Sequence, residues 1–380
     1  MQTQTFSAQN LAELTEKIDR FLAQSPDFKP TLAFLFCSVE QDLKGISHCF
    51  AERDIALFGA TTAGEILNDS VLENAIAVML LNLNPDAFRL LMAQNQEGVR
   101  QNAQNLAQVA QETFAQPALL VASAGLATNG DDIVEGVKNI IPNPKLFGAL
   151  AGDDFKMSGT FVFNQTAQTD NGLLFLALDT ERVSVEGLAT SGWKPVGTER
   201  TITKAAGNVI YTIDDEPALD VFIKYFKYED IDENEKADVI VKLGTNHPFH
   251  LQRPDGSSVL RAPLMSQEKA LIFAGAIPQG AKVRFSMPPD FTVIDQAIED
   301  VATLQTNLPE AEAILLFSCK ARHLALGMMV EDEIAGFQNL WQAPLVGLFS
   351  YGELGCKVGF QNCDFHNETS SVVILKEKSN

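Results

Sequence analysis

The sequence lacks the features that mark nucleic-acid-binding, membrane and secreted proteins. Lysine and arginine number 28 against 49 aspartate and glutamate residues, and the formal net charge is −21. A surface this acidic repels phosphate backbones and anionic lipids, so both are poor partners. No apolar run approaches the roughly 18 residues of a spanning helix, and the N-terminus has no basic segment followed by an apolar stretch. We therefore expect a cytoplasmic protein without membrane insertion.

Cysteine is scarce, and its pattern is typical of neither a disulfide framework nor a metal site. The five cysteines are Cys37, Cys49, Cys319, Cys356 and Cys363. An odd number without CxxC spacing predicts reduced thiols in a cytosol. The spacing of the last two cysteines is irregular and names no fourth ligand, which disfavours zinc. CxxCH is absent, so any haem would be held non-covalently.

The best-known catalytic motifs are absent as well. Gly59 and Gly64 have the spacing of a phosphate loop, but Glu65 follows them in place of lysine. The sequence contains no GxSxG elbow, and spacing identifies no nucleophile–base pair. We expect a protein that is not an enzyme. A hydrolase that uses Glu65, Asp154 and Glu353 is the alternative from another functional class.

What the sequence does contain is an alternation of helical and strand patterns, which predicts an α/β fold. Its 380 residues suggest two or three domains. Steps of three and four between apolar residues predict helices, at 10–23, 43–50, 99–114, 133–140, 294–304 and 334–340. Short continuous apolar runs predict buried strands, at 31–38, 55–66, 75–83, 118–126, 145–154, 172–179, 313–320, 344–354 and 370–376.

One arrangement of these elements occurs three times, which predicts repeated strand–helix units around mixed sheets. Each copy has a helix, a strand ending at Ser38, Ser123 or Ser318, a helical stretch, and a strand carrying a glycine. An acid follows each glycine after six residues, at Gly59–Glu65, Gly148–Asp154 and Gly347–Glu353. Around one axis, these bends would bring backbone N–H groups and carboxylates to one pocket. Alternatively, the glycines make tight bends and the acids cap neighbouring N–H groups.

A β-rich insert separates the second and third copies. It covers about 161–213, and its Gly207-Asn208 pair is typical of a hairpin turn. A helix is predicted from Pro217 onward. The charged stretch 229–238 is the best candidate for a domain boundary. We therefore expect an N-terminal helix within 1–30 and domains at 31–228 and 229–376.

Several separated motifs resemble those of the FIST proteins, named for F-box and intracellular signal transduction. They are GATTAGE (59–65), GALAGDD (148–154), SGWKPVG (191–197), FSCKARHLALG (317–327), GLFSYGELG (347–355) and HNET (366–369). The resemblance covers about residues 30–375. It implies that 31–228 is a FIST N-terminal domain and 229–376 a FIST C-terminal domain.

The resemblance implies a sensory protein for a small ligand, and amino-acid-like ligands have been proposed for the family. Family members are paired with histidine kinases, diguanylate-cyclase-type enzymes or chemotaxis proteins. Since nothing in the chain resembles an output domain, we expect a stand-alone sensor. It would signal to a separate partner such as a histidine kinase or a cyclic-di-GMP enzyme. The alternative that the resemblance implies is a haem-based nitric oxide sensor containing haem b.

The candidate ligand-binding residues lie at the bends and beyond the third repeated strand. They are Thr61, Thr62, Gly64, Glu65, Asp154, Arg322, Tyr351 and Glu353. Arg322 can clamp a carboxylate through two hydrogen bonds, and Tyr351 can donate one, although surface pairing and packing are the ordinary roles of both. If haem binds, we expect His247 or His250 as its axial ligand, in a loop beside Phe249.

Overall fold

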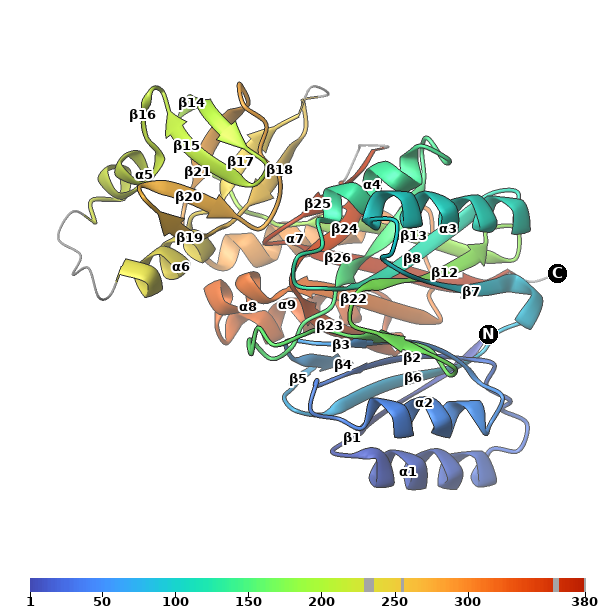
Figure 1. Cartoon of the computed structure of the whole chain (residues 1–380). Coiled ribbons are helices and arrows are strands. Elements are labelled where there is room, and N and C mark those ends of the chain that lie inside the picture. Colours follow the sequence, from blue (N-terminus) through green and yellow to red (C-terminus); the bar gives the residue numbers. More distant parts are fainter. Residues whose placement is uncertain (229–235, 254–255, 358–361, 379–380) are drawn as a thin grey trace.

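The computed structural model describes residues 1–228, 236–253, 256–357 and 362–378. Figure 1 shows a large body of sheets and helices with a smaller β-rich unit attached at one side. The predicted α/β class is confirmed. Within the described ranges, no helix is long and apolar enough to cross a bilayer.

The first sheet contains the first repeated unit. Across the sheet the strands are β1 (Gln2–Ala8), β6 (Ile76–Asn82), β2 (Leu32–Cys37), β3 (Ala56–Thr61), β10 (Val162–Phe163) and β11 (Gln168–Thr169). The central strands β2 and β3 are parallel, and β6 and β10 flank them in antiparallel orientation. α2 (Leu43–Ala51) connects the parallel pair, and α1 (Leu11–Gln24) lies beside it (Figure 1).

The second and third sheets repeat this order. The second contains β7 (Phe88–Gln94), β12 (Gly172–Asp179), β8 (Pro117–Ala124), β9 (Lys145–Leu150), β24 (Glu353–Cys356) and β25 (Cys363–His366). The third contains β13 (Val183–Thr190), β26 (Ser370–Glu377), β22 (Ala313–Cys319), β23 (Leu345–Ser350), β4 (Glu65–Leu67) and β5 (Ser70–Leu72). In both, the two central strands are parallel and their neighbours antiparallel.

Helices connect or cover these strands at the predicted places, except that α8 (Lys320–Leu326) was not predicted. The second sheet has α3 (Val99–Thr113) and α4 (Gly130–Lys138), and the third has α7 (Phe291–Ala302), α8 and α9 (Met329–Trp341). The described residues also include two short 3-10 helices, η1 (Pro85–Ala87) and η2 (Thr303–Thr306). The first repeated unit also has a strand, β1, that the sequence analysis missed. It contributes the antiparallel edge of the first sheet.

The three units exchange a hairpin, formed by the fourth and fifth strands of each unit, in a cycle. The first unit places β4 and β5 in the third sheet, the third places β24 and β25 in the second, and the second places β10 and β11 in the first. The inner faces meet in one core, where the rings of Phe36 and Phe317 lie 6.1 Å apart between sheets. Because each sheet is completed by another unit, the predicted repeats form one interlocked body, hereafter the three-sheet core.

The equal glycine-to-acid steps do not produce three equivalent acids. Glu65 pairs with Leu348, one residue after Gly347, and Glu353 pairs with Ala149, one residue after Gly148. In the first sheet, the equivalent pairing partner is Val162, which pairs with Ala60, one residue after Gly59. Asp154 lies earlier, in the longer segment between β9 and β10, because the second unit inserts a loop before its exchanged hairpin. The proposed equivalence of Asp154 is therefore wrong.

The smaller body contains β14–β21 with two helices and is called the β14–β21 unit. Its strands are β14 (Pro195–Ala206), β15 (Val209–Ile213), β16 (Glu216–Pro217), β17 (Phe249–Gln252), β18 (Ser258–Arg261), β19 (Pro263–Gln267), β20 (Ala270–Phe273) and β21 (Lys282–Ser286). The helices are α5 (Ala218–Phe226) and α6 (Lys236–Asn246). The predicted Gly207-Asn208 turn is confirmed, since Ala206 pairs with Val209. Strands from both sides of residue 228 share this unit, and part of the charged stretch, 229–235, lies outside the described residues.

Two local predictions are wrong. His250 lies in strand β17 rather than in a loop. Cys356 and Cys363 form a disulfide, because the pairing of β24 with β25 places them directly opposite each other. Cys37, Cys49 and Cys319 are free, as the sequence predicts, and they are buried.

Candidate functional site

A cavity of about 450 Å³ lies between the three-sheet core and the β14–β21 unit. Its core side is formed at the carboxyl ends of β9, β22 and β23 and by the loop after β8, and its other side by segments around 207–208 and 262–276. The carboxyl ends of parallel strands are a common location for ligands in α/β proteins. The volume is within the usual range for small-molecule sites.

The walls of this cavity are mostly apolar. Leu150 and Leu126 come from the core, Leu264 and Phe273 from the β14–β21 unit, and Phe155 from the loop after β9. Leu126 and Phe155 are among the exposed large apolar residues of the protein, as is Leu264. Apolar side chains at a cavity mouth favour ligands that bring apolar surface of their own.

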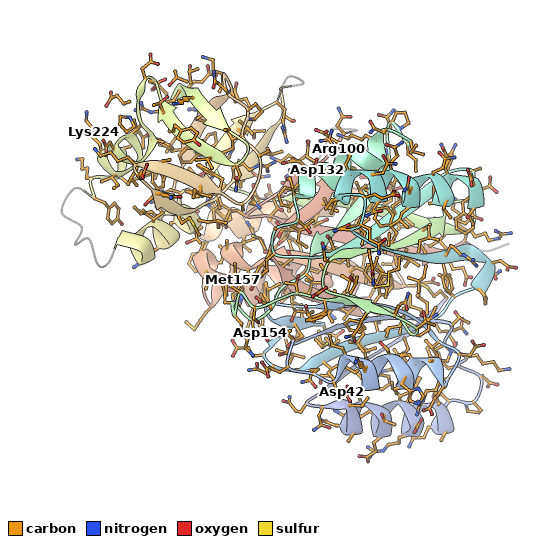
Figure 2. All side chains as sticks on the ribbon, in the orientation of Figure 1. Asp42, Arg100, Asp132, Asp154, Met157 and Lys224 are labelled. Atoms are coloured by element: carbon orange, nitrogen blue, oxygen red, sulfur yellow. A yellow bond between two sulfur atoms is a disulfide. The ribbon has the colours of Figure 1, made fainter. Side chains whose placement is uncertain are left out.

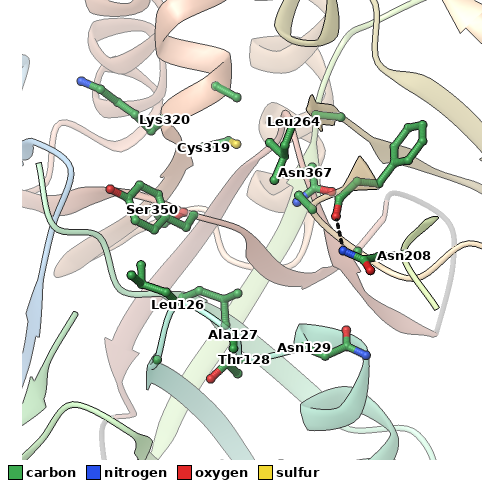
Figure 3. A pocket seen from close by; sticks show the side chains of 18 of the residues that line it. Leu126, Ala127, Thr128, Asn129, Asn208, Leu264, Cys319, Lys320, Ser350 and Asn367 are labelled. Atoms are coloured by element: carbon green, nitrogen blue, oxygen red, sulfur yellow. Dashed lines mark hydrogen bonds between the residues drawn. The ribbon is translucent and has the colours of Figure 1, made fainter. Parts of the chain in front are cut away.

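The polar groups of the lining are largely committed to protein partners. Thr128 Oγ1 donates to the Ala124 carbonyl (2.9 Å), and Asn208 Nδ2 donates to the Phe273 carbonyl (2.8 Å; Figure 3). Asn367 differs. This residue is 2% exposed. Its Oδ1 is buried and accepts no hydrogen bond, unlike the other buried side-chain oxygens of the described lining residues. A buried acceptor without a donor is costly in the free protein.

Tyr351 anchors the loop that borders the cavity. Its hydroxyl donates to Asp153 Oδ1 (2.5 Å) and accepts from the backbone N–H of Phe155 (2.9 Å). Asp153 Oδ2 accepts from the N–H groups of Ser158 and Gly159. Burial and the bond to Asp153 raise the pKa of Tyr351, so the hydroxyl keeps its proton. The tyrosine therefore supports the loop instead of offering a free donor.

The loop itself is strained. Asp154, Phe155 and Met157 have φ values of 54°, 61° and 51°, in the left-handed region that non-glycine residues seldom adopt. Such strain often accompanies functional segments. Met157 is 63% exposed and projects from the edge of the core (Figure 2). The 153–159 loop thus presents an aromatic and a thioether side chain at the mouth of the cavity.

A buried ion pair joins the two bodies beside the cavity. Arg261 of β18 is fully buried, and its Nη2 lies 3.0 and 3.1 Å from the two carboxylate oxygens of Asp131 in the first turn of α4. Arg261 Nη1 also donates to the carbonyl of Phe365 (2.9 Å). These bonds cross from the β14–β21 unit to the core, so they fix the relative position of the two cavity walls.

Cys319 contacts the cavity in front of two buried acids. Burial raises the pKa of its thiol, which therefore stays protonated. Behind it, burial raises the pKa of Glu353 to about 8, against hydrogen bonds from Ser350 (2.6 Å) and Thr369 (2.8 Å) that lower it. Burial also raises the pKa of Glu368, whose carboxyl oxygens have no hydrogen-bond partner within the described ranges. Burial therefore favours the uncharged form of all three groups.

The candidate residues of the first bend form hydrogen bonds within the bend and to the segments that pack against it. Glu65 Oε1 accepts from Thr62 Oγ1 (2.5 Å), and its Oε2 accepts from the N–H of Ala75 (3.0 Å). Burial raises the pKa of Glu65 to about 7, which these hydrogen bonds oppose. Thr61 Oγ1 donates to the carbonyl of Gly152, and the carbonyl of Gly64 accepts from the third sheet. This geometry matches the alternative in which the acid caps neighbouring groups.

The remaining predicted residues are not brought to one pocket. Asp154 accepts from Ser38 Oγ (2.7 Å) on the side of the first sheet. Arg322 is fully buried in an ion pair with Glu333, and its Nε lies 3.0 Å from that carboxylate. Of the eight candidate ligand-binding residues, Tyr351 is the one found in the cavity lining.

The two histidines lie inside the β14–β21 unit. The His247 ring stacks on Phe226 with centroids 3.8 Å apart, and its Nδ1 is 2.9 Å from the Ser286 carbonyl. Burial lowers the pKa of His250 to about 3, and its Nε2 is buried without a partner. Neither histidine lines the cavity. A haem needs an apolar slot beside its ligand, and the packing around these two side chains does not fit one.

The residues that line the cavity were mostly missed by the sequence analysis. They come from segments as distant as 125–129 and 367, so no local spacing connects them. Asn367 belongs to the HNET motif, which the sequence analysis quoted without assigning it a role. The signal available in the sequence was the position of this polar motif directly before the buried strand 370–376.

Two family models match the chain. The FIST N domain model matches residues 31–216, and the FIST C domain model matches residues 218–356. The two matches meet at residue 217, within the β14–β21 unit. A search of curated proteins finds no match.

Proposed function

We propose that this chain, which belongs to the FIST family of signal-transduction sensor domains, binds a small organic ligand between its two bodies. The observation that supports this proposal is the apolar cavity of about 450 Å³ with an unpaired acceptor on Asn367. A pocket with apolar walls and a few polar groups is the usual form of a small-molecule site. FIST domains are sensory rather than catalytic, and a preformed cavity suits that role.

A ligand in this cavity would contact residues of both bodies. A ligand that contacts both Leu150 and Leu264 would bind the closed arrangement of the two bodies more tightly than one in which the walls of the cavity have moved apart. Such a difference is what a ligand needs to shift a conformational equilibrium. The signal would then be a change in the position or mobility of the β14–β21 unit.

The test compares ligand binding to variants with a blocked cavity. Ala276→Trp fills it from the β14–β21 unit, and Ala321→Trp fills it from α8; both residues are lining residues. Ala51→Trp, on the exposed end of α2, is the matched control. In a thermal-shift and calorimetric screen of small molecules, ligands should bind the wild type and the control and lose affinity at least tenfold in both blocked variants. Ligands that bind all four proteins equally would refute this site.

We further propose that the output passes to a separate cytoplasmic partner, such as a histidine kinase or a cyclic-di-GMP enzyme. The support is the family's association with signal transduction. The measurement is kinase autophosphorylation or cyclic-di-GMP turnover with the purified protein added, with and without ligand. A ligand-dependent change that disappears in Ala276→Trp would support the pairing.

Catalysis by the repeated carboxylates finds no support in their geometry. Glu65 and Glu353 are fully buried, and each has both oxygens bonded to neighbouring groups. We propose that the protein does not turn over ester, amide or phosphate substrates. Turnover that is abolished by Glu353→Gln would contradict this.

A further inference from the structure

We propose that the ligand of the cavity is an uncharged, largely apolar molecule that donates a hydrogen bond to Asn367. This inference rests on the proposed function and adds the chemical class of the ligand. Three observations support it: the placement of the charged groups beside the cavity, the use of the lining hydroxyls by protein partners, and the unpaired oxygen of Asn367.

The first observation concerns charge. Asp131 is paired with Arg261, and Asp153 accepts three hydrogen bonds from Tyr351, Ser158 and Gly159. Lys320 lines the wall with its stem, whereas its Nζ points away (Figure 3) and lies 3.1 Å from His323 Nδ1. Because the acids are bonded to protein donors and the Lys320 ammonium is directed away, an ion entering the cavity would lose its hydration without a close opposite charge, which is strongly unfavourable.

The second observation concerns hydrogen-bond polarity. The hydroxyls of Thr128, Ser350 and Tyr351 donate to protein acceptors. Asn208 likewise donates to the Phe273 carbonyl. The buried oxygen of Asn367 has no donor in the part of the chain that the structure describes. A ligand that supplies an N–H or O–H group satisfies this oxygen, and one that offers an acceptor there leaves it unsatisfied.

The third observation concerns the mouth of the cavity. Leu126, Phe155, Met157 and Leu264 are lining residues that are also exposed to solvent. Two of them belong to the strained 153–159 loop. Exposed apolar side chains around an apolar cavity favour a ligand whose body extends to the rim, because more apolar surface is then removed from water. The donor group would be at the inner end of such a ligand.

Matched trios of small molecules test the ligand class. One trio is indole-3-acetamide, indole-3-acetate and tryptamine; the other is octanamide, octanoate and octylamine. Each keeps one apolar body and changes only the head group from neutral donor to anion to cation. We expect calorimetry to show an amide binding at least tenfold more tightly than both of its ions, with the binding lost in Ala276→Trp and retained in Ala51→Trp.

A near-isosteric substitution then tests the contact with Asn367. Asn367→Leu removes the amide group and keeps the branching of the side chain at Cγ, so amide affinity should fall about tenfold, the effect of one lost hydrogen bond. The affinity of ethylbenzene, which has no donor, should stay equal or rise. Circular dichroism and thermal unfolding confirm that the variant is folded. Unchanged amide affinity in a folded Asn367→Leu protein would overturn the assignment of this contact.

The other outcomes separate this inference from the function it rests on. If an ion binds as tightly as its amide and is lost in Ala276→Trp, the ligand class is wrong and the cavity remains the site. The same holds if all six compounds fail while the broader screen yields a ligand that depends on the open cavity. If neither experiment yields a ligand that the blocked variants lose, the proposed function itself is overturned.

Discussion

At the scale of single residues, buried acids stabilise the bends where the chain passes from one sheet to the next. Glu65 and Glu353 each accept from a hydroxyl three residues earlier, at Thr62 and Ser350. Each also accepts from the segment that precedes the last strand of its unit, at Ala75 and Thr369. These acids hold two loops together, which explains their burial without a role in binding.

The raised pKa of Glu353 predicts how the free energy of unfolding depends on pH. Burial raises its folded-state pKa to about 8, whereas the unfolded value is near 4.3. Between these values the folded state holds a proton that the unfolded state releases, so stability falls as pH rises from about 4.5 to 8. At pH 7 the loss from this group is about 4 kcal/mol.

Denaturant unfolding of the wild type and Glu353→Gln from pH 5 to 8 measures this effect. The variant should show a shallower decline, because glutamine does not ionise. Glu112→Gln, an exposed change on α3, is the control and should follow the wild type. A decline that is equally steep in all three proteins would show that Glu353 is not the responsible group.

Arg322 carries a second prediction at this scale. Its guanidinium is fully buried against Glu333 and also bonds to the carbonyls of Ser191 and Glu368. Arg322→Met should destabilise the fold by about 3–5 kcal/mol, because it leaves a buried charge without its partner. Adding Glu333→Leu should recover much of this loss in thermal unfolding. A residue that clamps a ligand would behave differently: its removal would weaken binding and leave stability nearly unchanged.

At the scale of elements, glycines allow neighbouring strands to approach closely. A Cβ on Gly148 would lie 1.9 Å from the carbonyl oxygen of Val121, and its φ is 141°. A Cβ on Gly59 would lie 2.3 Å from the ring of Phe163. The first obstacle is backbone, and the second is a side chain.

This contrast predicts which substitution can be rescued. Gly148→Ala and Gly59→Ala should both lower the free energy of unfolding by more than about 3 kcal/mol, since neither site has room for a methyl group. Adding Phe163→Leu should restore part of the stability of Gly59→Ala and none of that of Gly148→Ala. Equal rescue of both variants would contradict the packing described here.

The elements also show how far the sequence could lead. Most helices, most buried strands and the Gly207-Asn208 turn follow local patterns and were predicted, whereas α6, α8 and β1 were not. The exchange of hairpins was not, because apolar periodicity indicates which residues are buried and not which sheet buries them. For the same reason the six-residue step to Asp154 was misleading: an inserted loop changes the register without changing the spacing.

At the scale of the whole molecule, the cavity exists only because two bodies meet. Its lining combines residues near 126, 208, 274 and 367, which no motif connects. The sequence therefore predicted a sensory family and not its binding site. The ion pair of Arg261 with Asp131 holds the two bodies in their relative position. It should therefore control both the ligand affinity and the motion of one body relative to the other.

Arg261→Met tests this control. The change removes the bonds to Asp131 and to the carbonyl of Phe365 while keeping an unbranched apolar side chain. We expect faster hydrogen exchange in the segments on both sides of the cavity and at least tenfold weaker ligand binding, with the centre of the three-sheet core unchanged. Arg200→Met, at a half-buried pair with Asp214 inside the β14–β21 unit, is the control and should leave binding unchanged.

The most direct test of the central claim is hydrogen–deuterium exchange with and without a saturating ligand from the screen. The account predicts protection in segments of both bodies: 125–129, 153–157 and 319–321 in the core, and 262–276 in the β14–β21 unit. Protection confined to the bend around Glu65, or to the strand that carries His250, would contradict the account and place the ligand elsewhere.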